Sequence, residues 1–320
     1  WAAGPAGAGR PRGGRGGAPR GAAGGGVRGW GRRGGWAGGV AGRDFLPRMD
    51  LDEGIPEEGA TLVVVSQLVP AAHKAGALAQ RLLQLARTNA PAGEENCKIC
   101  LLADLKQAQK PNCPGDKEAV EALRRAVRRL NRTEGDRFIL AVRGSSAVKT
   151  QRASAGWERK RGAINQLVRR CRGEAGGFLA LEGDISFLRR AKYILALDAD
   201  TEPPLDTARR MAAAALHPLN RPVVDKRRGI VTDGYGILAP RVGVTLESAA
   251  ATPFSRVMAG AGGVTAYDTL AGDFYEDYFG RSIFAGKGLI HIEAFHACMD
   301  AFLPEERVLS HDILEGGVLR

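Results

Sequence analysis

Asp198 and Asp200 lie two residues apart at the end of an apolar run, residues 193–197. A run of this kind is typical of a buried parallel strand, and open α/β sheets bind ligands where such strands end. Two carboxylates on one short turn can bind a hard divalent cation and, through it, a diphosphate. The D-x-D pattern alone also fits a strand end at which Asp198 accepts hydrogen bonds from backbone N–H groups, since short motifs often match by chance.

Two further carboxylates fall where a nucleotide-sugar enzyme would place them. Asp104 follows another apolar run, and Asp312 lies near the C-terminal end of the sequence. Sugar transfer from a diphosphate donor requires cations at the leaving diphosphate and a base that takes the proton of the acceptor hydroxyl. Asp198 and Asp200 can meet the first requirement through Mg²⁺ or Mn²⁺, and Asp312 can meet the second.

A basic helix start and several aromatic side chains could complete such a site. Lys160 and Arg161 open a predicted helix, and cations near a helix N-terminus suit a diphosphate; a solvated basic helix end is the alternative. Trp157, Tyr235 and Tyr275 could stack on the faces of a sugar ring, although core packing is the commoner role of such residues.

The elements that must position these residues alternate along the chain. Apolar runs predict strands at residues 61–65, 98–103, 137–143 and 193–197. Amphipathic stretches predict helices at residues 71–89, 117–131, 157–171 and 205–216. This alternation predicts an α/β fold with a mostly parallel, doubly wound sheet. Farther on, residues 229–240 and 242–246 are predicted to be extended, and residues 289–301 to begin extended and become helical.

Charge and composition divide the chain into two parts. The formal charge is +11, but the first 40 residues hold seven arginines and no acid, which leaves 39 basic against 35 acidic residues elsewhere. We therefore expect residues 1–58 to form a low-complexity Gly/Arg-rich arm and linker that is disordered, and residues 59–320 to form one domain. No specific nucleic-acid partner is expected, since only the arm is strongly basic.

Cysteine spacing and hydropathy bear on other classes of protein. The five cysteines are odd in number and irregularly spaced, which argues against a disulfide framework. Cys97 and Cys100 form a C-x-x-C pair, but no second such pair accompanies it, so buried thiols are favoured over a zinc site. No apolar run approaches the roughly 18 residues of a membrane span, and no signal peptide is apparent.

An alternative interpretation of the D-x-D-x-T pattern is the first motif of haloacid-dehalogenase-type phosphatases. Asp198 would then be the nucleophile that accepts the phosphoryl group, and Asp200 the general acid. Residues 272–277 (GDFYED) fit the metal motif of that class. Two features disagree, since three predicted strands precede the D-x-D and Lys287 follows the G-D motif instead of preceding it. Lys226 is a possible substitute.

From about residue 61 to residue 320 the sequence resembles the glycosyltransferase domain of cyclic β-1,2-glucan synthases, glycosyltransferase family 84, a GT-A-type family similar to family 2. Six segments carry the resemblance in the same order and at similar spacing: residues 156–162 (GWERKRG), 197–201 (LDADT), 217–222 (HPLNRP), 234–242 (GYGILAPRV), 284–288 (FAGKG) and 309–316 (LSHDILEG). Each segment is weak alone, and together they are specific. The match is dense from Trp157 onward and diffuse over residues 61–150.

The resemblance implies a reaction as well as a fold. It implies a GT-A-type core that transfers glucose, with inversion, from UDP-glucose to a growing β-1,2-glucan. It further implies that Asp198 and Asp200 bind the metal and the diphosphate. Asp312 would deprotonate O2 of the acceptor glucose.

Further site residues and partners follow from the same resemblance. Asp104 matches the acid that contacts uridine, and Lys160 and Asn165 match a donor-side K-x-x-x-x-N element. Four residues of the matching segments are assigned to the acceptor or sugar pocket: Trp157, Tyr235, Lys287 and His311. In the family, this domain faces the cytoplasm between transmembrane helices and is joined to a phosphorylase-like domain.

The sequence also departs from the family pattern. An R-W element that follows the S-H-D segment in the family does not occur before Arg320, and Ser66-Gln67 replaces a usual Pro-Thr. Because the sequence also begins with Trp1, we expect a fragment. An active glucosyltransferase core and a non-catalytic remnant that still binds nucleotide-sugar or glucan are therefore both kept as hypotheses.

Overall fold

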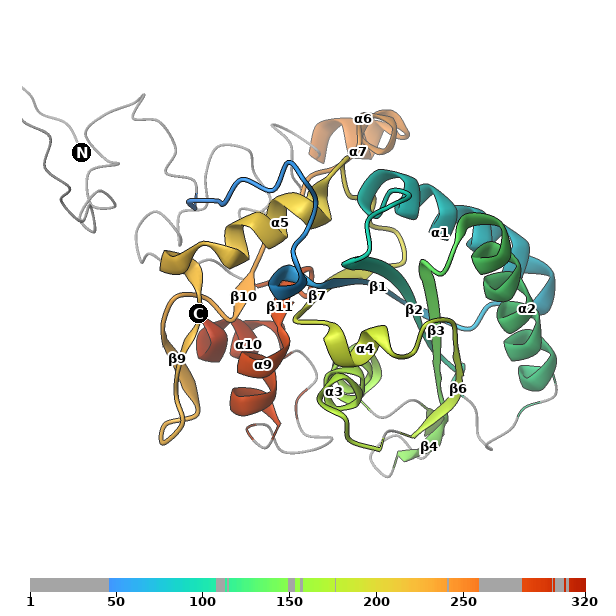
Figure 1. Cartoon of the computed structure of the whole chain (residues 1–320). Helices are drawn as coiled ribbons and strands as arrows, with labels where there is room; N and C mark the ends of the chain where they lie inside the picture. The colour runs from blue at the N-terminus through green and yellow to red at the C-terminus, as the bar shows by residue number, and fades with distance from the viewer. Residues whose placement is uncertain are drawn as a thin grey trace, which may run out of the picture.

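A seven-stranded sheet forms the centre of the molecule (Figure 1). The structure, a computed structural model, describes residues 46–107, 113, 115–148, 153–155, 158–175, 177–240, 242–258, 284–300, 302, 308 and 311–320, without the side chains of 146–148 and 153–155. The strand order is β10-β11-β7-β1-β2-β3-β6. Four neighbouring strands are parallel: β1 (Thr61–Leu68), β2 (Cys97–Asp104), β3 (Phe138–Arg143) and β7 (Tyr193–Asp198).

The remaining strands of the sheet lie at its two edges. β6 (Phe178–Glu182) is antiparallel to β3. At the other edge β11 (Gly288–His291) is antiparallel to β7, and β10 (Ile237–Leu238) is antiparallel to β11. Five of the seven strands therefore run in one direction, which confirms the predicted α/β fold with a mostly parallel sheet, consistent with a GT-A-like core.

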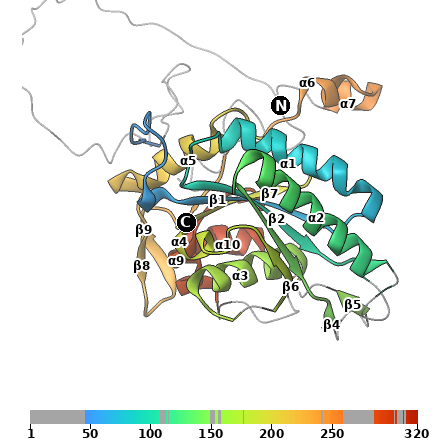
Figure 2. The same cartoon turned by 45° about the vertical axis from the view of Figure 1, so that its right-hand side comes forward.

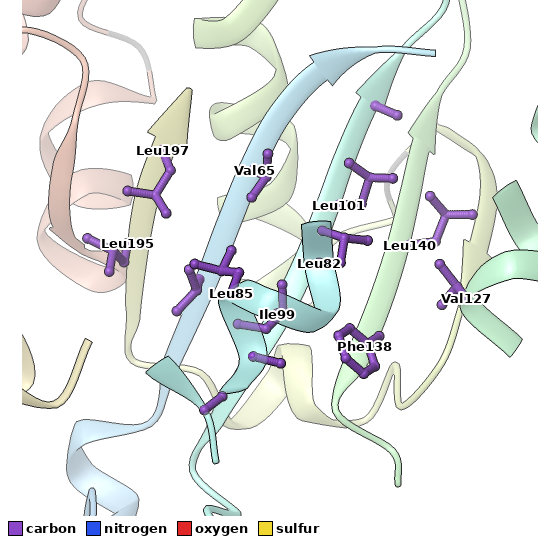
Figure 3. Packing of buried hydrophobic residues seen from close by; sticks show 14 of the residues in the cluster. Val65, Leu82, Leu85, Ile99, Leu101, Val127, Phe138, Leu140, Leu195 and Leu197 are labelled. Carbon is purple, nitrogen blue, oxygen red and sulfur yellow. The ribbon is translucent and has the colours of Figure 1, made fainter. Parts of the chain in front are cut away.

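Apolar side chains on both faces explain why the central strands are buried. Val63 and Val65 of β1 belong to one hydrophobic cluster, whereas Leu62 and Val64 belong to another on the opposite face. Alternation of this kind follows from the period of two in a strand. Figure 3 shows Leu82 and Leu85 of a covering helix packed over Val65, Ile99 and Leu101. The two clusters together contain residues 62–65 of β1, 99–103 of β2 and 193–197 of β7, as expected of a sheet covered on both sides.

Helices cover the two faces of the sheet as separate layers (Figures 1 and 2). The layer on the face of Val63 contains α1 (Ala75–Asn89), α2 (Asp116–Glu134) and α5 (Thr207–Leu216). The opposite layer contains α3 (Arg159–Arg172), α4 (Phe187–Arg190), α9 (Ile292–Met299) and α10 (Asp312–Leu319). The predicted helices thus fold close to their predicted ranges, because their apolar stripes face the sheet.

Smaller elements complete the described part of the chain. Two short antiparallel ladders join β4 (Ser146–Val148) with β5 (Ala153–Ala155) and β8 (Val223–Asp225) with β9 (Ile230–Asp233). Single turns of 3₁₀-helix form η2 (Glu57–Gly59), η3 (Ala72–Lys74) and η4 (Pro218–Asn220), and two short helices form α6 (Leu246–Ala250) and α7 (Pro253–Met258). No helix in these described ranges is both long and apolar enough to cross a bilayer.

The structure differs from the sequence-based expectation in several places. Residues 242–246 were expected to be extended, but 242–245 form no strand and α6 begins at Leu246, where Thr245 caps its first turn. The strands β4, β5, β6 and β8 and the helices α4 and α10 were not predicted. Residues 46–58 were assigned to the linker but pack on the domain: Met49 N–H donates to the Ala213 carbonyl at 2.9 Å, and Ile55 is buried in the core. The packed structure therefore begins before residue 59.

Candidate functional site

The carboxyl end of β7 lies at the point where the strand order reverses. β2 and β3 follow β1 on one side, whereas β7 pairs with β1 on the other side, with Asp198 opposite Ser66. Ligands of open α/β sheets bind outside the strand ends at such a switch point. Within the described residues, the buried hydroxyls of Ser66 and Thr201 have no hydrogen-bond partner there. Unpaired buried hydroxyls are uncommon in folded proteins, so this edge offers polar groups to a ligand.

Asp198 is held by two lysines that come from distant parts of the chain. Lys160 Nζ donates a hydrogen bond to Asp198 Oδ1, and Lys287 Nζ lies 2.9 Å from Asp198 Oδ2. Burial acts to raise the pKa of the Asp198 carboxyl, but the hydrogen bonds from the two lysines outweigh it and hold this pKa below its usual value. Asp198 is therefore an anion within a locally cationic site.

Lys160 is positioned by an unusual start of α3. Glu158 and Arg159 both have positive φ, +46° and +48°, a conformation that costs non-glycine residues roughly 1–3 kcal/mol each. The Glu158 carboxylate pairs with the guanidinium of Arg161, and both side chains are buried. This buried pair fixes the turn in which Lys160 lies. Lys160 Nζ thereby donates both to Asp198 and to the carbonyl oxygen of Gly286, the latter at 2.6 Å.

Gly286 joins this cluster to Asp312. Its φ is +73°, and a Cβ placed on it would lie 3.1 Å from Asp312 Oδ2 and 3.2 Å from Oδ1. The Asp312 carboxylate thus lies where a side chain at position 286 would begin, while the Gly286 carbonyl accepts a hydrogen bond from Lys160. Asp312, the candidate base, begins α10 next to the lysines that hold Asp198.

A second carboxylate lies one helical turn from Asp312. Glu315 is buried in α10, and residues three apart on a helix share a face. Burial, reinforced by the charge of Asp312, raises the pKa of the Glu315 carboxyl to about 7, although Arg161 and Lys160 oppose this shift. His311 precedes α10, and burial and the charge of Arg161 lower the pKa of its imidazole. His311 therefore lies near the buried ion pair at the start of α3.

Asp104 lies at the same edge of the sheet, and its carboxylate forms an ion pair with Arg143. Arg143 Nε and Nη2 donate to its two carboxylate oxygens at 2.6 and 3.0 Å, and Asp104 and Arg143 are also cross-strand neighbours. Arg143 Nη2 donates in addition to the carbonyl of Arg159 at 3.0 Å. Asp104 thus supports the start of α3 through Arg143, which sequence reasoning missed because only strand register reveals the pair.

Three other predicted site residues have less direct positions. Asp200 is exposed two residues beyond Asp198. Asn165 is buried in α3, but five residues turn a helix by about 140°, so it does not share a face with Lys160. Trp157 lies outside the described residues. The structure therefore brings together Lys160, Asp198, Lys287 and Asp312, with His311 and Asp200 nearby in sequence.

Tyr235, which was predicted for the sugar pocket, lies away from Asp198 in the sheet. It precedes β10, in which Ile237 is level with Ile290 of β11 and hence with Ile194 near the start of β7. Because β10 runs parallel to β7, Tyr235 lies at the amino-end edge of the sheet, opposite Asp198. There the guanidinium of Arg320 lies 5.7 Å from its ring centroid. The sequence gives no strand direction, so this position is visible only in the structure.

The alternative sites also have defined positions. Cys97 and Cys100 of β2 belong to different hydrophobic clusters on opposite faces of the sheet, so the pair is not arranged to share a metal. Lys226 is exposed in the turn between β8 and β9. The G-D motif at residues 272–277 lies outside the described residues. Lys287 does contact Asp198, but D-x-D follows β7, not the first strand of the sheet.

The carboxylates fit a divalent cation as part of a shared site. Asp198 and Asp200 offer hard oxygen donors on one turn, as Mg²⁺ and Mn²⁺ require. Within the described ranges, however, no three His, Cys, Asp or Glu side chains gather to bind a metal. Phosphate oxygens and water would have to supply the other ligands, which is how Mg²⁺ is usually bound at phosphate sites.

Comparison with known proteins shows one informative similarity. No protein-family model matches the chain. The chain is 33% identical over 293 residues to the cyclic β-(1,2)-glucan synthase NdvB of Rhizobium meliloti (strain 1021). The alignment includes 88% of this chain but 10% of that synthase, so the chain spans about a tenth of the length of this curated relative.

Proposed function

Because the chain belongs to the cyclic β-1,2-glucan synthase family, through the glycosyltransferase domain of that family, we propose that it transfers glucose from UDP-glucose to a growing β-1,2-glucan with inversion. One observation carries this proposal: at the switch point of the sheet, Lys160 and Lys287 hold Asp198, and Gly286 joins this cluster to Asp312. Diphosphate-binding cations and a carboxylate base thus lie side by side, as sugar transfer from a nucleotide donor requires.

In the proposed reaction, Asp312 accepts the proton of the acceptor O2 hydroxyl as that oxygen attacks C1 of the donor glucose. The bond between C1 and the diphosphate oxygen breaks, and its electron pair leaves with UDP. Attack from the face opposite the leaving group inverts the configuration at C1. Lys160 and Lys287 stabilise the developing charge on the diphosphate.

A divalent cation and a sugar pocket complete the proposal. Mg²⁺ or Mn²⁺ would be held by Asp198 and Asp200 and would offset charge on the diphosphate. The buried hydroxyls of Ser66 and Thr201 flank this place and would be satisfied by donor oxygens. We assign His311 and Trp157 to the acceptor side, and Asp104 and Asn165 to the donor side at greater distance.

The setting of the domain is part of the proposal. By family kinship it would face the cytoplasm in a membrane-associated synthase, flanked by transmembrane helices and a phosphorylase-like domain. A non-catalytic remnant that binds UDP-glucose or glucan is the second candidate. It is favoured by Ser66-Gln67, which stands in place of the usual Pro-Thr beside the site.

The test measures binding and turnover in the same variant. Asp312→Asn is expected to bind UDP almost as well as the wild type but to release UDP from UDP-glucose and a β-glucan acceptor about a hundredfold more slowly, as for a lost general base. Asp233→Asn, which changes an exposed carboxylate, is the control and should leave both unchanged. If the wild-type chain binds UDP but releases none from UDP-glucose, it is the non-catalytic remnant. Phosphate-ester hydrolysis abolished by Asp198→Asn would instead support the phosphatase interpretation.

A further inference from the structure

We infer that Lys160 and Lys287 block the access of a divalent cation to the Asp198 carboxylate until a nucleoside diphosphate binds; this inference rests on the proposed function. The cation and the diphosphate would then bind only together, and the two lysines would couple them. The inference concerns how the site is filled and is separate from the chemistry of transfer.

Both oxygens of Asp198 are already engaged by ammonium groups. Lys160 Nζ donates to Oδ1, and Lys287 Nζ lies 2.9 Å from Oδ2. A cation that coordinated either oxygen would stand next to an ammonium group, and like charges at such separations repel strongly. Asp198 is therefore available to a metal only after at least one lysine has moved.

The charge balance of the cluster gives the same result. Two ammonium groups, Lys160 and Lys287, lie against the single carboxylate of Asp198, so these three groups together carry a formal charge of +1. A group of this kind does not attract a dication, and no trio of metal-binding side chains exists elsewhere in the described residues. A diphosphate adds negative oxygens that can pair with the lysines and also coordinate the cation.

The two lysines are placed to exchange one partner for another. Their side chains are partly exposed, 31% for Lys160 and 24% for Lys287, and they reach Asp198 from separate elements, the start of α3 and the loop before β11. A lysine has a flexible four-carbon stem and a point charge without fixed geometry. Each ammonium group can thus turn to a phosphate oxygen at the same strand end without movement of the sheet.

Thermodynamic linkage makes the coupling measurable from either ligand. If UDP raises the affinity for the cation by some factor, the cation raises the affinity for UDP by the same factor. Removing one lysine should reduce this factor in two ways. The cation alone binds better because its repulsion is weaker, and UDP alone binds less well because it loses a partner.

The experiment titrates the full chain with MnCl₂, with and without saturating UDP, by calorimetry and by the electron paramagnetic resonance of free Mn²⁺. The wild type should bind Mn²⁺ at least tenfold more tightly with UDP. Lys160→Met and Lys287→Met should each tighten Mn²⁺ binding without UDP and lower the coupling factor, whereas Lys287→Arg, which keeps the charge, should not tighten it. Lys226→Met, an exposed lysine in the β8–β9 turn, is the matched control and should behave as the wild type.

Two results would overturn the inference. Equal Mn²⁺ affinity with and without UDP in the wild type would exclude the coupling, and this measurement does not depend on whether any variant folds. Coupling that is unchanged in both Met variants would assign it to groups other than the lysines. Failure of the proposed function has a different signature, since the chain would then either bind no UDP at any Mn²⁺ concentration or bind UDP without transferring glucose from UDP-glucose.

Discussion

The backbone of Gly286 lies against the carboxylate of Asp312, so closely that a Cβ on Gly286 would stand 3.1 and 3.2 Å from its two oxygens. The same residue accepts a hydrogen bond from Lys160 on its carbonyl, 2.6 Å from Nζ. A single peptide unit thus separates the donor-side lysine from the candidate base. Its positive φ of +73° and this close approach both favour glycine.

Gly286→Ala should therefore impair transfer more than folding. The left-handed conformation costs alanine about 1–2 kcal/mol, and the added methyl group must displace the Asp312 carboxylate by a few tenths of an ångström. We expect the free energy of unfolding to fall by this cost of about 1–2 kcal/mol. The release of UDP during transfer should slow by roughly tenfold or more. Gly76→Ala is the control, because nothing lies within 4 Å of its added Cβ and alanine favours the helix. Equal losses of activity in both variants would contradict the expectation.

Glu315 should make stability depend on pH. Its folded-state pKa, about 7, lies above its ordinary value of 4.5, so between these values the folded chain holds a proton that the unfolded chain has released. The free energy of unfolding should therefore fall as pH rises from about 4.5 to 7, by roughly 3 kcal/mol. Below this window the contribution is fully present, and above it the contribution is lost.

Glu315→Gln should remove this pH dependence, since glutamine stays neutral. The measurement is urea unfolding of both proteins at several pH values, and the difference between them isolates the effect of Glu315 from that of every other group. Glu247→Gln changes an exposed residue of α6 and serves as the control. A difference between wild type and Glu315→Gln that is constant from pH 4.5 to 8 would show that Glu315 does not titrate near 7.

Asp104 and Arg143 should be strongly coupled in stability. Arg143 is almost fully buried, so Asp104→Asn leaves its guanidinium without the opposite charge, a change that typically costs about 3–5 kcal/mol in a buried pair. Arg143→Met should also destabilise the chain, and the double variant should lose clearly less than the sum. Denaturant unfolding of the four proteins gives the coupling energy. Additive losses would mean that the bidentate pair contributes little beyond its separate parts.

Cys97 and Cys100 should react slowly with a thiol reagent in the native protein. Both are fully buried, and burial raises the pKa of each thiol well above its usual range, which suppresses the reactive thiolate. The rates at which they react with a chromogenic disulfide should rise sharply in denaturant.

Removal of divalent metals by a chelator should leave the midpoint of the unfolding transition unchanged, since Cys97 and Cys100 lie on opposite faces of the sheet. A lower midpoint after chelation would instead support the zinc hypothesis.

The central part of the fold was predictable because local patterns determine it. The strands from β1 to β3 and β7 are continuous apolar runs, and their helices carry apolar stripes, so both are visible in the sequence. β6 was missed because its short run, between glycines, lacks alternation and gains its strand structure only by pairing with β3. The segment at residues 46–58 was missed because few apolar residues anchor it, and Ile55 finds its partners far away in the sequence.

For the candidate site, the sequence pointed to residue types but not to their contacts. Carboxylates at strand ends identified Asp198 and Asp104, and motif similarity identified Lys160 and Asp312. The roles of Gly286 and Glu315 depend on how β11 and α10 pack, which no local pattern encodes. A matching motif assigned Tyr235 to the sugar pocket, whereas strand direction places it at the edge of the sheet opposite Asp198.

The pairing of β11 with β7 also has a consequence for how the chain acquires its site during folding. Asp198 lies at the end of the parallel core, yet its partner Lys287 comes 89 residues later, directly before a strand that must run back beside β7. Contacts between such distant residues form late, because closing a long loop costs entropy before any contact compensates it. A nascent chain could thus complete the core while the site remained unassembled. Docking of β11 is then the step that brings Lys287 to Asp198 and completes the candidate site.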